Sequence, residues 1–187
     1  MKVKWLGVLL LSAAVAAACG QGRAIFNVDV YSFLRGTGKD TVPYFVPAGV
    51  SASASSVPQN VNLPGVGSSL VDSVRAFGTA DLRNATGAGT IGLQVYLAAD
   101  SAGSAGTFNP SALALTVPTK NVSGTSTTAD TIRGDISAAL NALFTKSQLW
   151  IRFQATASNP PPSVTPLQGK AVLTSLLLTV IIEDKFF

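Results

Sequence analysis

The chain has 187 residues, of which 47% are hydrophobic and only 12% are charged, whereas about a quarter of the residues are charged in typical soluble domains. When Lys2 and Lys4 are set aside, eleven basic residues remain against nine acidic ones, and this weak, scattered charge argues against nucleic-acid binding. The chain has no histidine and one cysteine, so it can form no internal disulfide and lacks the commonest general base and metal ligand.

The first eighteen residues have the pattern of a secretory signal peptide. Lys2 and Lys4 supply the positive region, Trp5–Val15 the apolar region, and Ala16–Ala18 the small residues before a cleavage site. Cleavage after this segment would leave Cys19 at the new N-terminus.

The run from Ala16 to Gly20 resembles the bacterial lipoprotein signal, in which small residues precede a cysteine that is acylated on its sulfur. The resemblance implies lipid attachment at Cys19 and a location in the cell envelope, on the periplasmic side or at the cell surface. In a cell with two membranes, Gly20 in place of aspartate implies the outer membrane, although the family prefers leucine where Ala16 stands. Ordinary secretion with cleavage near Ala18 stays open, as does an uncleaved anchor, which is short of the about 20 apolar residues that span a bilayer.

This reading divides the chain into a signal peptide over 1–18, a tether over 19–23 and one domain over 24–187. From Phe26 onward the hydrophobic pattern mostly has a period of two, which predicts half-buried strands. The best predicted hairpin pairs Leu70–Arg83 with Thr90–Ala99 across a turn rich in glycine and asparagine.

The proline-rich stretch Arg35–Ser69 is expected to form at most short edge strands. The period of the hydrophobic pattern changes once, over residues 129–146, where apolar residues recur at helical spacing. We therefore expect a helix over 129–146. A strand over 149–156 follows, and the almost wholly apolar run 171–182 predicts a strand covered on both faces. We expect an antiparallel two-sheet sandwich of the Greek-key or jelly-roll type with this one helix.

No set of residues points to catalysis. A serine hydrolase would need a base beside its nucleophile, and the chain has neither histidine nor a Gly-x-Ser-x-Gly motif. The carboxylates follow no spacing that pairs two on one face, and Asp72 and Asp81 are the most interesting because they interrupt or flank strands. No calcium loop occurs, and transition-metal ligands are lacking. We expect no enzyme, no cofactor and no metal; an enzyme using carboxylates alone would need two of them within about 5 to 10 Å.

Aromatic residues are the candidates for a binding face, because flat rings stack on sugars and apolar solutes, although in strands they are more often core or cross-strand pairs. The candidates are Tyr31, Phe33, Tyr44, Phe45, Tyr96 and Trp150. We expect a non-enzymatic structural or interaction module, such as an accessory subunit of a membrane complex, with protein partners in the envelope and membrane lipid bound through acylated Cys19. Binding of a small molecule or carbohydrate is the alternative.

Overall fold

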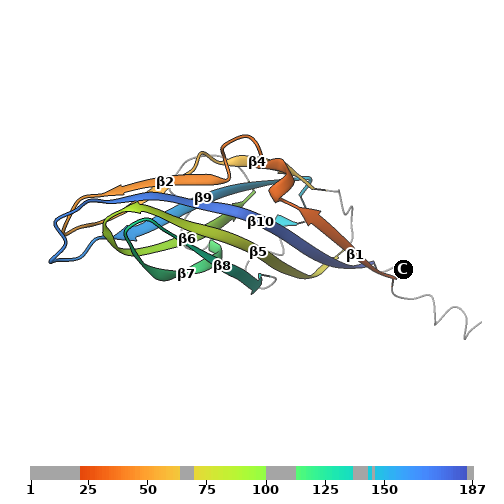
Figure 1. The fold of residues 1–187 in the computed structure, drawn as a ribbon. Coiled ribbons are helices and arrows are strands. Elements are labelled where there is room, and N and C mark those ends of the chain that lie inside the picture. Colours follow the sequence, from red (N-terminus) through yellow and green to blue (C-terminus); the bar gives the residue numbers. More distant parts are fainter. Residues whose placement is uncertain (1–21, 64–69, 100–112, 137–142, 145, 185–187) are drawn as a thin grey trace, which may run out of the picture.

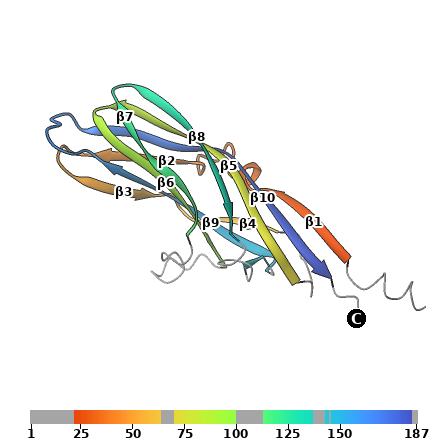
Figure 2. The same cartoon turned by 90° about the horizontal axis from the view of Figure 1, so that it is seen from below.

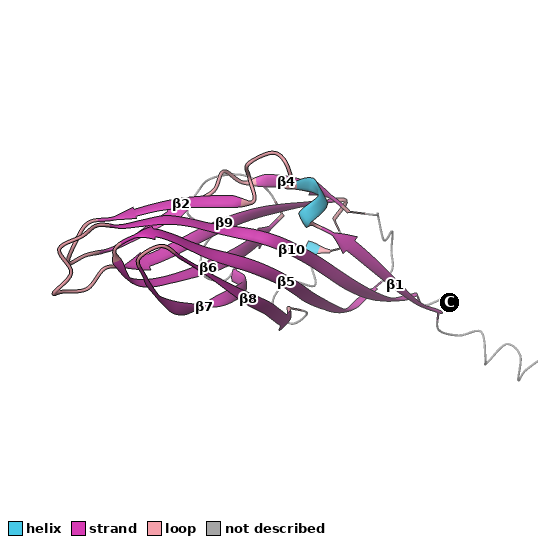
Figure 3. Cartoon of the chain, in the orientation of Figure 1, coloured by secondary structure: helices cyan, strands magenta, loops and turns pink. Residues whose placement is uncertain are grey.

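The computed structural model describes residues 22–63, 70–99, 113–136, 143–144 and 146–184, and nearly all of them lie in antiparallel strands. The strands of this described part are β1 (Gly22–Asp29), β2 (Thr41–Val46), β3 (Ser51–Ser55), β4 (Gln59–Asn62), β5 (Leu70–Thr86), β6 (Ala88–Ala98), β7 (Leu113–Ser123), β8 (Ser126–Asp135), β9 (Gln148–Ser158) and β10 (Leu167–Asp184). Among the described residues, helical structure is confined to short turns, of which η1 (Tyr31–Phe33) is the longest (Figure 3).

The strands form two sheets packed face to face, which confirms the predicted sandwich. Sheet A has the order β1-β10-β5-β8, and β2 pairs with another part of β10. Sheet B has the order β3-β9-β6-β7, and β4 pairs with another part of β9. The long strands β5 and β10 run side by side along sheet A (Figure 1). At about 3.3 Å per residue, the 18 residues of β10 span the length of the sandwich.

Four connections between the sheets gather at one end of the sandwich. They are the arches from β2 to β3, β5 to β6, β7 to β8 and β9 to β10, and the strand registers place all of them beside the start of β10 (Figures 1 and 2). The start of β1 lies at the opposite end, because Gly22 pairs with Asp184 at the end of β10. The two ends of the described chain therefore leave the sandwich close together.

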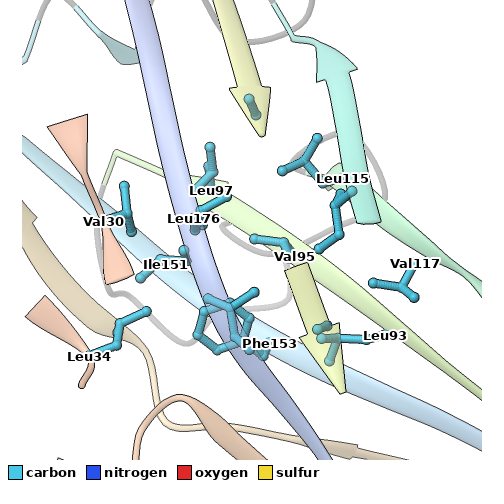
Figure 4. Close-up of a cluster of buried hydrophobic side chains, with 14 of the residues drawn as sticks. Val30, Leu34, Leu93, Val95, Leu97, Leu115, Val117, Ile151, Phe153 and Leu176 are labelled. Atoms are coloured by element: carbon cyan, nitrogen blue, oxygen red, sulfur yellow. The ribbon is translucent and has the colours of Figure 1, made fainter. Parts of the chain in front are cut away.

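The core lies between the sheets and follows from the alternation along each strand. In Figure 4, side chains from β6, β7, β9 and β10 meet those of the segment around η1, and Phe153 and Leu176 are each only 1% exposed. The labelled members are Val30, Leu34, Leu93, Val95, Leu97, Leu115, Val117, Ile151, Phe153 and Leu176. Full burial of such side chains contributes about 1.5–3 kcal/mol each.

A buried asparagine ties together the arched end of the sandwich. The side chain of Asn84 is 3% exposed, and its Nδ2 donates to the carbonyl oxygens of Gly87 at 3.1 Å and Gly124 at 2.7 Å. Its Oδ1 lies 3.1 Å from the hydroxyl of Tyr44, which donates there or to the Arg83 carbonyl at the same distance. Burial raises the pKa of the Tyr44 hydroxyl further above physiological pH. One side chain thus joins two arches to β2.

The predicted hairpin of Leu70–Arg83 with Thr90–Ala99 is wrong. Strands β5 and β6 follow one another with only Gly87 between them, yet β5 pairs with β10 and β8, and β6 pairs with β7 and β9. Gly87 has a φ of +75°, which glycine adopts at little cost, and the chain there crosses to the other sheet. Alternation is the same in a hairpin and in such an arch, so the pattern could not separate them.

The predicted helix over 129–146 is also wrong where the structure describes it. Residues 126–135 form β8, which pairs with β5 from Asn84↔Ser126 to Arg75↔Asp135. Ile132 and Ile136 are four residues apart, which places them on one side of a helix. Four is also twice the strand period of two, so the same spacing places them on one side of a strand, and both side chains are buried. Residues 137–142 and 145 lie outside the described residues. The described part of the stretch 35–69, expected to form at most short edge strands, contains the short strands β2, β3 and β4.

Candidate interaction surface

The outer face of sheet A carries large apolar side chains on three adjacent strands. Ile25 of β1 is 60% exposed, Leu70 and Phe77 of β5 are 56% and 43% exposed, and Leu177 of β10 is 39% exposed. The registers place Leu177 opposite Phe77, and Ile181 between Ile25 and Ser73. We call these five side chains, Ile25, Leu70, Phe77, Leu177 and Ile181, the apolar face. They all lie in the half of sheet A remote from the arches.

Arginines border the apolar face. The guanidinium of Arg133 on β8 lies 5.1 Å from the centroid of the Phe77 ring, within the range of a cation–π contact. Arg75 projects from the same side of β5, two residues before Phe77. These three residues, with Ala76, Gly134 and Asp135, line an open hollow of about 600 Å³. Aromatic and arginine side chains are the types enriched in protein interfaces.

Toward the arches the same face becomes polar. The hydroxyl of Thr79 is 2.8 Å from that of Thr174 and 2.7 Å from that of Ser175. Farther along, the guanidinium of Arg83 contacts the carboxylate of Asp81 at 2.8 Å. These groups bond to one another. The exposed apolar side chains therefore gather in the other half of this face, and Phe45 on β2 is a separate exposed ring in the arched half.

The outer face of sheet B has a different chemistry. A hollow of about 450 Å³ there is lined almost entirely by hydroxyl-bearing side chains and two alanines: Ser51, Ala52, Ser53, Thr90, Thr119, Thr156, Ala157 and Ser158. No charged side chain borders this hollow in the described part of the chain. The two outer faces of the sandwich are therefore chemically distinct.

The six predicted aromatics do not form one platform. Tyr96 and Trp150 lie together on the outer face of sheet B, where the Arg152 guanidinium is 5.2 Å from the Tyr96 ring centroid and Tyr96 is only 8% exposed. Tyr44 is buried at the arched end of the sandwich. Phe45, 59% exposed, lies on β2.

Tyr31 and Phe33 are in η1, where Tyr31 packs against the main core and Phe33 is 46% exposed. None of the three hollows found among the described residues includes any of the six aromatics in its lining. Cys19, the predicted lipid attachment site, lies outside the described residues.

Asp72 and Asp81, the two carboxylates singled out from the sequence, lie in ion pairs, and so does Asp130. Asp72 is 3.9 Å from Arg23, Asp81 contacts Arg83, and Asp130 is 3.0 Å from the Lys120 ammonium. The hydrogen bond from Lys120 is the main cause that holds the pKa of Asp130 below its usual value. Within the residues described, no three His, Cys, Asp or Glu side chains are grouped as a metal site would need. The same residues contain no helix that is both long and apolar enough to cross a bilayer.

Sequence reasoning missed the apolar face because it selected aromatics by type. The useful signal was a large apolar residue on the side of a strand whose other side chains are polar. Phe77 shares its side of β5 with Ser73, Arg75 and Thr79, and Ile25 shares its side of β1 with Arg23 and Asn27.

No protein-family profile matches the chain, and no curated protein matches its sequence. Among solved structures, a chain of the Gx strain of infectious bursal disease virus is similar over 89% of this chain and 37% of its own length, with 8% identity and a TM-score of 0.44. A chain of another particle of that virus is 10% identical over 86% of this chain and 39% of its own, with a TM-score of 0.35. The chain thus spans less than two fifths of these viral chains.

A third solved structure, TmCBM61 in complex with beta-1,4-galactotriose, is 12% identical over 83% of this chain and 88% of its own length, with a TM-score of 0.27. These likenesses are too distant to carry an argument about function, which has to come from the surface itself.

Proposed function

We propose that the protein is a non-enzymatic interaction module of the bacterial envelope, anchored through acylated Cys19, whose apolar face docks against a membrane-associated protein. The observation that carries this proposal is the gathering of exposed Ile25, Leu70, Phe77 and Leu177 on three neighbouring strands of one face. A protein partner accounts for the arginines beside Phe77, because apolar anchors bordered by arginine are characteristic of interface centres.

The position of the apolar face supports a partner at the membrane. Cys19 precedes Gly22, the first residue of β1, by three residues, which span at most about 11 Å when extended. The half of sheet A that contains the apolar face begins at this same end. An acylated Cys19 would therefore hold the apolar face near the bilayer, where an envelope complex could meet it.

The docking test is co-purification from native membranes with two matched phenylalanine variants. Phe77→Ser removes a 43% exposed ring from the apolar face, whereas Phe45→Ser removes a 59% exposed ring from the other end of the same sheet. If Phe77 is a central anchor, its truncation should cost at least about 2 kcal/mol of binding, or roughly thirtyfold in affinity. The same protein should accompany the wild type and Phe45→Ser but be lost from Phe77→Ser.

Unchanged co-purification with Phe77→Ser, in a variant whose thermal unfolding matches that of Phe45→Ser, would refute docking through the apolar face. The anchor is tested separately by intact mass spectrometry of the membrane-extracted protein. A mature chain that starts at Cys19 and carries two or three acyl chains is expected, and an unmodified soluble chain would remove the anchor from the proposal.

Carbohydrate binding is the second candidate, favoured by one observation on sheet B. The hydroxyl-lined hollow and the half-buried Trp150 lie on the same outer face, and hydroxyls and aromatic rings are the groups that recognise sugars. Trp150 stands six residues before Thr156 of the hollow along β9, so only an extended oligosaccharide would contact both. Neutral oligosaccharides that quench tryptophan fluorescence in the wild type but not in Trp150→Leu would support this function. A lack of any change at millimolar concentration would argue against it.

A further inference from the structure

Strand β1 is an edge strand of sheet A. One side of β1 pairs with β10 over its whole length, from Gly22↔Asp184 to Asp29↔Leu177, and no strand among the described residues pairs with its other side. The strand β2 meets β10 farther along, between Thr41↔Val172 and Val46↔Leu167, so it does not cover β1. In Figure 2, β1 lies at the margin of the sandwich.

This edge lacks most of the features with which proteins usually prevent strand addition, and its two charged residues, Arg23 and Asp29, are of opposite sign. Edges are commonly interrupted by proline, bulged, short or marked by lysine. The edge strand β2 contains Pro43, and β7 contains Pro118 and shifts in register against β6, while β3 and β4 have only 5 and 4 residues. The edge strand β8 lies beside β7, to which the ion pair of Lys120 and Asp130 joins it. By contrast, β1 has 8 residues, no proline, no lysine and an unbroken register.

The backbone groups along the free side of β1 can be assigned. The amide of Val30, just after β1, donates to the carbonyl oxygen of Leu176 on β10 at 2.9 Å. Backbone groups alternate in direction along an antiparallel strand, so even-numbered residues of β1 bond toward β10. The amides of Arg23, Ile25, Asn27 and Asp29 and the carbonyls of the first three therefore point away from the sheet, ready to pair with another strand. The Asp29 carbonyl already accepts a bond from the Ser32 hydroxyl at 2.7 Å.

We propose that the occupant of this edge is β1 of a second copy of the chain, paired antiparallel about a twofold axis at Phe26. Directly opposite residues of two antiparallel strands point to the same face of the sheet. Side chains alternate along β1, so an odd-numbered residue must lie opposite an odd-numbered one, and an even-numbered residue opposite an even-numbered one. An axis at Phe26 places Arg23 opposite Asp29 of the second copy, and the twofold axis makes this contact twice. An axis at Ile25 or Asn27 leaves these charges unmatched within β1.

Two features of the single copy agree with this pairing. Arg23 reaches Asp72 only at 3.9 Å with a 60% exposed side chain, so it is weakly held where it is. The inward-facing Ala24 and Phe26 are only partly buried against the core, although they belong to its side of the sheet. In the dimer Phe26 would lie opposite Phe26 of the second copy and cover this margin of the core.

The dimer would also extend the apolar face. A twofold axis perpendicular to the sheet keeps both outer faces on the same side, so the two apolar faces would adjoin across Ile25 and Asn27. The inference goes beyond the proposed docking function and does not depend on it.

Single-cysteine crosslinking in the full-length protein in native membranes tests both the dimer and its register. Phe26→Cys should form an intermolecular disulfide, because opposite residues at the axis bring their Cβ atoms to about 4.5–5.5 Å. Ile25→Cys alone should not crosslink, whereas Ile25→Cys co-expressed with Asn27→Cys should. The wild type, which contains only Cys19, is the control.

Charge reversal provides a second measurement on the detergent-extracted protein, by analytical ultracentrifugation. Arg23→Asp should raise the dimer dissociation constant by roughly tenfold or more, because it creates two like-charged cross-strand pairs. Adding Asp29→Arg should restore dimerisation. Three results would overturn the proposal: a monomer at all concentrations, an Ile25→Cys homodimer, or a Phe26→Cys adduct with a different protein. A failure of docking at Phe77 would leave these crosslinks unaffected.

Discussion

Replacing the buried Asn84 with alanine should destabilise the sandwich strongly. The variant loses two bonds, at 3.1 and 2.7 Å, from Nδ2 to the carbonyls of Gly87 and Gly124, together with the acceptor that faces the Tyr44 hydroxyl. A hydrogen bond contributes about 1 kcal/mol net, and a buried group left without a partner costs about 1–3 kcal/mol. Because the Tyr44 hydroxyl can still donate to the Arg83 carbonyl, we expect the free energy of unfolding to fall by about 2–4 kcal/mol.

Urea unfolding followed by tryptophan fluorescence measures this loss, since the midpoint shifts in proportion to stability while the slope stays constant. Asn121→Ala is the control, because Asn121 is exposed on β7 and should change stability by less than about 0.5 kcal/mol. Tyr44→Phe should be less damaging than Asn84→Ala, and the two changes should not be additive because they share one bond. If Asn84→Ala proved as mild as Asn121→Ala, the arched end would not depend on this hydrogen-bond network.

Three further variants test other parts of the fold. Gly169→Ala should prevent folding or cost more than about 3 kcal/mol, measured by thermal unfolding, because its Cβ would clash with the backbone carbonyl of Arg83. Lys120→Met should make stability less sensitive to acid. The hydrogen bond from Lys120 lowers the pKa of Asp130 in the folded state. The stability that this carboxylate contributes is therefore present above about pH 4 and is lost as the pH falls through the folded-state pKa. Urea midpoints at about pH 6 and about pH 3 should therefore differ less in this variant than in the wild type. Phe153→Ala should cost about 3–5 kcal/mol in the same assay, because it empties a site in the core.

The class of fold followed from the sequence because a period of two dominates the chain. The distribution of strands between the sheets did not, since the side-chain pattern of β5 and β6 is the same whether they form a hairpin or an arch across Gly87. The helix prediction failed for a related reason. A spacing of four places Ile132 and Ile136 on one side of either a helix or a strand, and only the pairing of β8 with β5 separates the two.

The apolar face was less accessible to sequence reasoning than the fold. The run 171–182 was predicted to be covered on both faces, yet Leu177 in its middle is 39% exposed. Recognising the face requires knowing which phase of each strand points outward, and also that β1, β10 and β5 are neighbours. The outward side of each strand can be read from the alternation of its residues. The order of the strands depends on pairing between segments more than a hundred residues apart, such as Ile25↔Ile181.

Photo-crosslinking in intact cells tests the docking claim most directly. A photoreactive phenylalanine analogue would be placed at Phe77 on the apolar face, and for comparison at Phe45 and at Thr156 on the outer face of sheet B. The proposal predicts one defined protein adduct from position 77 and none from the other two positions. Adducts of equal yield at all three positions, or an adduct only from position 156, would contradict it.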